Sequence, residues 1–256
     1  FTYGDDLQLS NTSDVVRLTV ANVVIDEVSY SSNAGYPDFA GASLTLVGTP
    51  DAGQNDVAGA WCAAGTRFGA GDFGTPGAAN GACLRYGAAL ATGDVVITEI
   101  MPNPRAVLDN LGEWFEVYNP GPGAVDLEGV TVSDLAEDGF TVGASLLINA
   151  GDYAVFGLNG TIGTNGGIAV DYVYPEADFT LANGTNGDEV VIAYAGTLID
   201  KVAYLQTFSF GNGISMSLSP GGTAITNDAA ANWCAASTTL GSEDRGTPGL
   251  ANDTCP

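Results

Sequence analysis

Residues 74–80 have the sequence Gly-Thr-Pro-Gly-Ala-Ala-Asn, and residues 246–252 have the sequence Gly-Thr-Pro-Gly-Leu-Ala-Asn. A Trp-Cys-Ala-Ala tetrapeptide precedes each stretch, at residues 61–64 and 233–236. All four stretches are related by one offset (234 − 62 = 172). Self-similarity at a fixed spacing is typical of modular repeat proteins. The sequence therefore predicts two copies of one module.

The four cysteines, Cys62, Cys83, Cys234 and Cys255, occupy matching places in the two copies (83 − 62 = 255 − 234 = 21). Four cysteines allow three pairings. The duplication favours the pairing in which each copy is closed by its own bond, Cys62–Cys83 and Cys234–Cys255. A zinc site is disfavoured because it uses cysteines that lie close together in sequence. Disulfides are typical of oxidising compartments, so we expect a secreted, extracellular or cell-surface protein.

The repeat extends upstream of the cysteines, where residues 24–30 parallel residues 198–204. The first copy is shorter than the second. We predict that residues 1–84 are the C-terminal half of a module and that residues 94–256 are a complete module. Residues 85–93 are small and predict a flexible linker. The chain begins at Phe1 with no leader, which we interpret as a processed or excised segment.

The composition excludes several classes of protein. There are 30 acidic and 6 basic residues and no histidine. A net charge of −24 repels phosphate backbones and anionic lipids, so we expect no nucleic-acid partner. Without histidine, no Ser-His-Asp or Cys-His centre can form. No apolar stretch reaches the roughly 20 residues of a membrane-spanning helix, so we expect no membrane insertion.

Short apolar runs alternate with Gly- and Asn-rich turns, which is typical of an all-β sandwich. Helical periodicity is not sustained anywhere. In the second copy the pattern predicts strands at residues 94–100, 113–119, 130–134, 146–148, 153–156, 179–181, 189–193, 198–204 and 215–219, and at the Trp233 segment.

Several motifs of the second copy stand in the order of a known family: residues 95–104, 112–119, 125–130, 187–191 and 246–252. Together they resemble the lamin tail domain, in its bacterial secreted or surface form. The resemblance covers residues 94–256 and, for its second half, residues 7–83. It implies immunoglobulin-like β-sandwich modules in tandem. It also implies a non-enzymatic role in display, adhesion or protein interaction.

The densest group of oxygen ligands lies near the start of the second copy: Glu99, Asn103, Asp109, Glu113 and Glu116. If the strands that carry them pair, several oxygens could converge on a Ca²⁺ ion, which takes six to eight oxygen ligands. The alternative is an acidic loop exposed to water. No EF-hand spacing supports calcium.

The sequence thus predicts an extracellular structural or adhesive repeat protein. It would act through protein partners or self-association. The short first copy has three competing explanations: the sequence is a fragment of a longer array, the two copies share one continuous sandwich, or strands of a neighbouring chain complete the first copy. The third, which we take as the hypothesis, would make the protein a fibre subunit. The alternative is a monomeric calcium- or glycan-binding adhesion module of a larger secreted protein, with Trp114 either in the core or on the surface for contact with a glycan. We expect no enzyme activity, because Glu113 and Glu116 would point to opposite faces of a strand.

Overall fold

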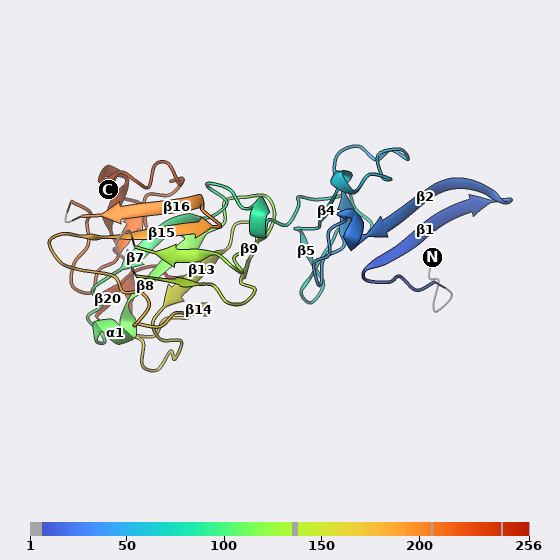
Figure 1. Cartoon of the computed structure of the whole chain (residues 1–256). Coiled ribbons are helices and arrows are strands. Elements are labelled where there is room, and N and C mark those ends of the chain that lie inside the picture. The colour runs from blue at the N-terminus through green and yellow to red at the C-terminus, as the bar shows by residue number, and fades with distance from the viewer. Residues whose placement is uncertain (1–6, 135–137, 206, 242, 256) are drawn as a thin grey trace. The chain divides into compact units, whose positions relative to one another are not determined.

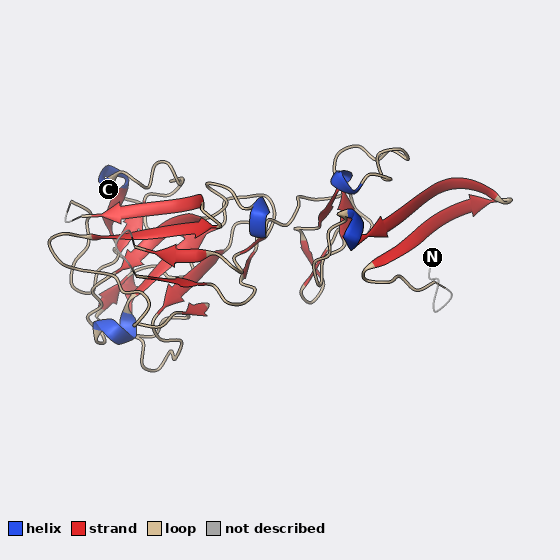
Figure 2. Cartoon of the chain, in the orientation of Figure 1, coloured by secondary structure: helices blue, strands red, loops and turns tan. Residues whose placement is uncertain are grey.

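The structure of the chain is a computed structural model that describes residues 7–134, 138–205, 207–241 and 243–255. It divides into two compact units, unit 1 ending at Leu84 and unit 2 starting at Arg85. Strands make up nearly all of its regular structure (Figures 1 and 2). The prediction of an all-β fold is confirmed.

The larger sheet of unit 2 has six strands, in the order β14, β13, β8, β7, β17 and β18. Its pairings are antiparallel except for that of β13 with β14. β7, the first strand of unit 2, thus lies between β8 and a strand from near the end of the unit. The strands are β7 (Val96–Met101), β8 (Trp114–Tyr118), β13 (Tyr153–Gly157), β14 (Tyr172–Val173), β17 (Met216–Leu218) and β18 (Trp233–Ala235).

The second sheet of unit 2 has four strands, in the order β11, β10, β15 and β16. They are β10 (Thr131–Ser133), β11 (Gly139–Thr141), β15 (Asp188–Tyr194) and β16 (Thr197–Tyr204). Apolar side chains alternate along the strands, so each sheet offers one apolar face. Ile97 and Phe115 of the larger sheet and Val190 and Val202 of the smaller one belong to the same buried cluster. The two sheets therefore form a sandwich (Figure 1).

Shorter elements complete unit 2. They are β9 (Val125–Asp126) paired with β12 (Leu147–Ile148), β19 (Thr239–Leu240) paired with β20 (Asp244–Arg245), the helix α1 (Asp109–Gly112) and the 3-10 turns η3 (Gly87–Ala89) and η4 (Ala230–Asn232).

The prediction of a strand at residues 179–181 is wrong. Phe179 and Leu181 are buried, as the apolar pattern suggested, but they lie in irregular chain. The backbone N–H of Leu181 donates to the carboxylate of Glu113 (3.0 Å) instead of to a strand carbonyl. The other strands predicted for unit 2 are found within two residues of their predicted bounds.

Residues 85–93 pack into unit 2. The N–H of Arg85 donates to the carbonyl of Ala124 (3.0 Å), and the N–H of Asp126 donates to the carbonyl of Arg85 (2.9 Å). The side chain of Leu90 is 4% exposed and belongs to the main core. These ladder bonds and this burial make the segment part of unit 2 rather than the flexible linker that its composition suggested.

Unit 1 consists of three two-stranded pairs. The longest is the hairpin of β1 (Ser13–Val20) and β2 (Val23–Ser31). The others are β3 (Leu44–Leu46) with β4 (Trp61–Ala63) and β5 (Arg67–Phe68) with β6 (Asp72–Phe73), and the 3-10 turns are η1 (Ser32–Ala34) and η2 (Ala58–Ala60).

The hairpin of unit 1 repeats the hairpin β15–β16 of unit 2. In unit 1 the register shifts after Leu18, which pairs with Asp26, and in unit 2 it shifts after Ile192, which pairs with Asp200. The offset here is 174 (200 − 26), and downstream it is 172, as between β3 and β17. The repeat seen in the sequence is thus a repeat of structure.

Candidate functional site

Two glutamates face each other in the middle of the six-stranded sheet. Glu99 of β7 pairs with Glu116 of β8, and both side chains are 0% exposed. Phe115 and Val117 point into the main core. Successive side chains of a strand alternate between faces, so Glu116 lies on the opposite face of the sheet. Like charges directly opposite each other are destabilising, so this pair needs compensating contacts.

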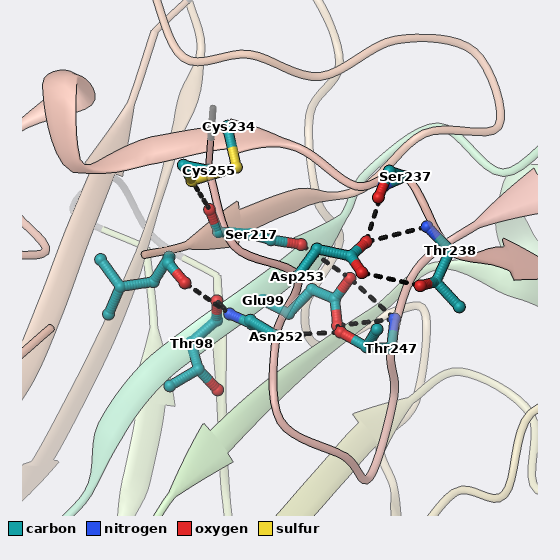
Figure 3. Close-up of a disulfide and its surroundings, with 11 residues drawn as sticks. Thr98, Glu99, Ser217, Cys234, Ser237, Thr238, Thr247, Asn252, Asp253 and Cys255 are labelled. Carbon is teal, nitrogen blue, oxygen red and sulfur yellow. Dashed lines mark hydrogen bonds between the residues drawn. A yellow bond between two sulfur atoms is a disulfide. The ribbon is translucent and has the colours of Figure 1, made fainter. Parts of the chain in front are cut away.

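Glu99 receives these contacts from late in the chain (Figure 3). The hydroxyl of Ser217 donates to it at 3.0 Å, and the hydroxyl of Ser215 donates to the same oxygen. Thr247 donates its backbone N–H at 3.0 Å and its hydroxyl at 2.9 Å. An ionised carboxylate only accepts hydrogen bonds, so these donors suit a charged Glu99.

Glu116 has fewer donors. The hydroxyl of Thr98 lies 2.6 Å from its carboxyl, and the N–H of Gly249 donates at 2.7 Å. Burial, together with the nearby charge of Glu99, raises the pKa of Glu116 to about 9. Burial also raises the pKa of Glu99, while bonds from Ser215 and Thr247 lower it. At neutral pH Glu116 therefore keeps its proton.

Residues 246–255, which we call the closing segment, are fixed at several points (Figure 3). The side-chain amide of Asn252 donates to the carbonyl of Thr98 (2.7 Å) and to that of Leu218 (2.9 Å). Asp253 accepts bonds from Thr238 and Ser237, which lower its pKa to about 2. The closing segment thus joins the strands β7 and β17.

Both predicted disulfides are present, Cys62–Cys83 and Cys234–Cys255. The second one ties the end of the closing segment to β18. Such bonds are typical of oxidising compartments. No helix in the described ranges has the length and apolar character needed to span a membrane.

Replacing Cys234 and Cys255 by serine is expected to lower the free energy of unfolding of unit 2 by about 3 kcal/mol, because the unfolded chain regains the freedom of the closed loop. Urea unfolding followed by tryptophan fluorescence would measure the change. The matched control replaces Cys62 and Cys83, which should leave the transition of unit 2 in place. If both variants lowered the free energy of unfolding of unit 2 equally, the stabilisation could not be assigned to the bond between Cys234 and Cys255.

The calcium site predicted at Glu99, Asn103, Asp109, Glu113 and Glu116 does not form as one cluster. Asn103, Asp109 and Glu113 line one surface groove, whereas Glu99 and Glu116 are buried under the closing segment. Among the described residues, no group of three or more acidic, histidine or cysteine side chains could hold a metal ion. The carboxyl groups of Glu99, Glu113 and Glu116 instead accept hydrogen bonds from the protein itself.

Trp114 belongs to the core. It is 1% exposed and packs with Met101 and Val155. Of the two alternatives that the sequence left open, the core position is confirmed. The alternative of a glycan contact is wrong, because a surface ligand cannot reach the ring.

A second buried polar pair was not predicted. The carboxylate of Asp200 accepts the N–H of Ile97 (2.6 Å) and the side-chain amide of Asn227 (2.7 Å). The Asn227 amide also donates to the carbonyl of Ile97 (3.3 Å). The pair thus binds both the backbone N–H and the backbone carbonyl of Ile97 in β7. Its signal in the sequence is that both residues recur in the first copy, as Asp26 and Asn55.

Unit 1 preserves this pair, although no strand among its described residues (7–84) takes the place of β7. The amide of Asn55 donates to Asp26 at 2.9 Å, and the indole of Trp61 donates to the carbonyl of Asn55, also at 2.9 Å. Asn80 donates to the carbonyl of Leu46 at 3.0 Å, as Asn252 does to Leu218 in unit 2. These bonds of the late part of the module therefore recur in both units.

The apolar side chains of the unit 1 hairpin are exposed. Leu18 is 60% and Ile25 54% exposed, whereas their counterparts Ile192 and Ile199 are 1% and 0% exposed. A groove of about 690 Å³ lies beside the hairpin, lined among others by Leu9, Val16, Val28, Tyr30, Tyr36 and Trp61. In unit 2 the corresponding residues are covered by the strands of a complete sandwich.

Unit 2 is thus an immunoglobulin-like β-sandwich closed by a disulfide. Its buried carboxyl groups accept hydrogen bonds that hold its strands together. Residues 88–206 match the model of the Lamin Tail Domain family, so this part of the chain is similar to a lamin tail domain. The match starts within residues 85–93, the first segment of unit 2, and ends before β17. The comparisons with curated proteins and with solved structures gave no match.

Proposed function

We propose that the chain is an extracellular structural or adhesive repeat protein in which unit 1 is completed by strands of a neighbouring chain. The observation that carries the proposal is the exposure of Leu18 and Ile25, whose counterparts in unit 2 are buried. Exposed apolar patches mark interaction surfaces, and exposed strand edges pair with other chains. The two disulfides support a location outside the reducing cytosol.

A non-enzymatic role fits the chemistry of unit 2. Glu99 and Glu116, whose pKa values are raised by burial, are covered by the closing segment and bonded to protein donors. A catalytic carboxyl group must reach a substrate, and these do not. The lamin tail domain is an immunoglobulin-like module, which supports a role in display or assembly.

Light scattering of the native chain over a range of concentrations tests the proposal. We expect particles of more than one chain whose mass rises with concentration, because in the pure protein the exposed apolar hairpins of two chains can pack against each other. A variant with Leu18→Lys and Ile25→Lys should shift the particles towards single chains. The matched control is Ile162→Lys, which changes a residue of unit 2 that is 58% exposed. Single chains at every concentration would contradict assembly and favour a monomeric adhesion module.

A further inference from the structure

We propose that unit 1 is an acceptor for one kind of β-strand, a segment of a neighbouring polypeptide that carries a glutamate between apolar residues, in the pattern of β7. The inference rests on the proposed function and names the chemistry of the missing strand. It is argued from unit 2, where the same groups surround β7.

The first group is a strand edge. In unit 2, β17 pairs with β18 on one side and with β7 on the other, where Ser217 stands opposite Glu99. In unit 1 the counterpart of β17 is β3, which pairs with β4 in a two-stranded sheet. The second edge of β3 has no strand among the described residues, so its backbone groups are available for one.

The second group is a set of hydroxyls. Glu99 is held in unit 2 by Ser215, Ser217 and Thr247, and the same positions in unit 1 are hydroxyl residues. They are Ser43, Thr45 and Thr75 (215 − 43 = 217 − 45 = 247 − 75 = 172).

No glutamate of unit 1 can serve these hydroxyls. Residues 1–84 contain one glutamate, Glu27, and it forms an ion pair with Arg17 on the hairpin. Thr45 is 4% exposed, so a carboxylate that reached it would leave water and need such donors. The hydroxyl set therefore selects a strand with a glutamate in the place of Glu99.

The third group is the pair Asp26 and Asn55. Its counterpart, Asp200 and Asn227, binds both the N–H and the carbonyl of Ile97. Asn55 is 8% exposed and already bonded to Asp26. The pair is therefore preformed and offers an acceptor and a donor to a strand backbone, which lowers the entropy cost of binding.

A strand from unit 2 of a second copy is a poor occupant. Moving β7 from its own sandwich would expose the core there and leave Asp200 without the N–H of Ile97. The exchange would complete unit 1 of one chain but leave unit 2 of the other chain without β7. The occupant must instead be a strand that is not already part of a complete module.

The test uses the full chain and a synthetic peptide with the sequence of residues 94–104, which contains β7. Hydrogen exchange should show new protection at residues 24–28 and 44–46 when the peptide is added. A peptide in which lysine replaces the glutamate should bind at least about tenfold more weakly, because it buries a charge that the hydroxyl set cannot pair.

Variants of the chain provide the second arm. Asp26→Asn removes the carboxylate that accepts the strand N–H, and Thr45→Val removes one hydroxyl with little change of shape. Each should weaken peptide binding several-fold. The matched control is Asp56→Asn, at an exposed neighbouring position. Protection of residues 61–63 without peptide would show that each variant remains folded.

Protection outside unit 1, or equal binding of the glutamate and lysine peptides, would overturn the inference. Specific binding by a chain that light scattering finds single would support the acceptor while contradicting assembly. Particles whose size is unchanged by saturating peptide would mean that assembly uses another surface, and they would overturn the assignment of unit 1 as the joint.

Discussion

Raising the pH from 5 to 9 is expected to lower the free energy of unfolding of unit 2 by about 3–6 kcal/mol. The main cause is Glu116, whose pKa is raised by burial to about 9 in the folded chain, against 4.5 as its ordinary value. The folded state binds this proton more tightly than the unfolded state. The stabilisation is therefore complete below pH 4.5 and is lost as the pH rises through 9.

Other buried carboxyl groups act in the same direction. Burial raises the pKa of Glu113 to about 8 and that of Asp200 to about 6. Asp253 has the opposite shift, to about 2, so its contribution changes only in acid, below this window. Between pH 5 and 9 the stability of unit 2 should therefore fall steadily.

Urea unfolding at a series of pH values would measure this dependence. Glu116→Gln provides the control, because the amide is neutral at every pH and should flatten most of the slope. Glu113→Gln should remove a smaller part near pH 8. A stability that stayed constant or rose over this range would contradict the protonated state of Glu116.

Glu99→Ala is expected to lower the free energy of unfolding of unit 2 by about 3–5 kcal/mol. The change removes the acceptor for Ser215, Ser217 and Thr247 and leaves their buried donors unsatisfied. It also removes the bonds of Thr247 in the closing segment to β7, while that of Asn252 to Thr98 remains. Hydrogen exchange should show loss of protection at residues 246–252, and chemical unfolding would give the energy.

Glu99→Gln is the matched comparison, because the amide keeps one acceptor oxygen and nearly the same volume. It should cost about 1–2 kcal/mol, since only part of the hydrogen bonding is lost. If alanine and glutamine had equal effects, the donors around Glu99 would not be the source of its contribution. If neither had an effect, the closing segment would be held by its other contacts, which are the disulfide and the bonds of Gly249, Asn252 and Asp253.

The sequence allowed the fold class, most strands of unit 2 and both disulfides to be predicted, because these depend on local patterns. Alternating apolar residues mark a strand wherever they occur, and the cysteine spacing repeats with the motif that ends at Asn252. The exception, residues 179–181, shows the limit of such patterns: burial of Phe179 and Leu181 was predictable, but the carboxylate that replaces a ladder bond was not.

The role of the acidic residues could not be predicted in the same way. Glutamate is rarely buried without a partner, so a group of acidic residues suggests a solvated or metal-binding surface. Glu99 and Glu116 are buried because donors from residues 215–249 reach them. That contact joins positions far apart in the chain, and neither hydrophobic period nor local spacing reveals it. One sequence feature did point to these donors: the hydroxyl residues at positions 215, 217 and 247 recur at positions 43, 45 and 75 of the first copy.

The bond between Glu99 and Thr247 also bears on the order of events during synthesis. It joins residues 148 positions apart, and the strand it completes lies in the middle of the larger sheet. Contacts of such long range form slowly and late. Unit 2 therefore cannot close its larger sheet until residues 246–252 have been synthesised, so the chain stays open through most of its synthesis.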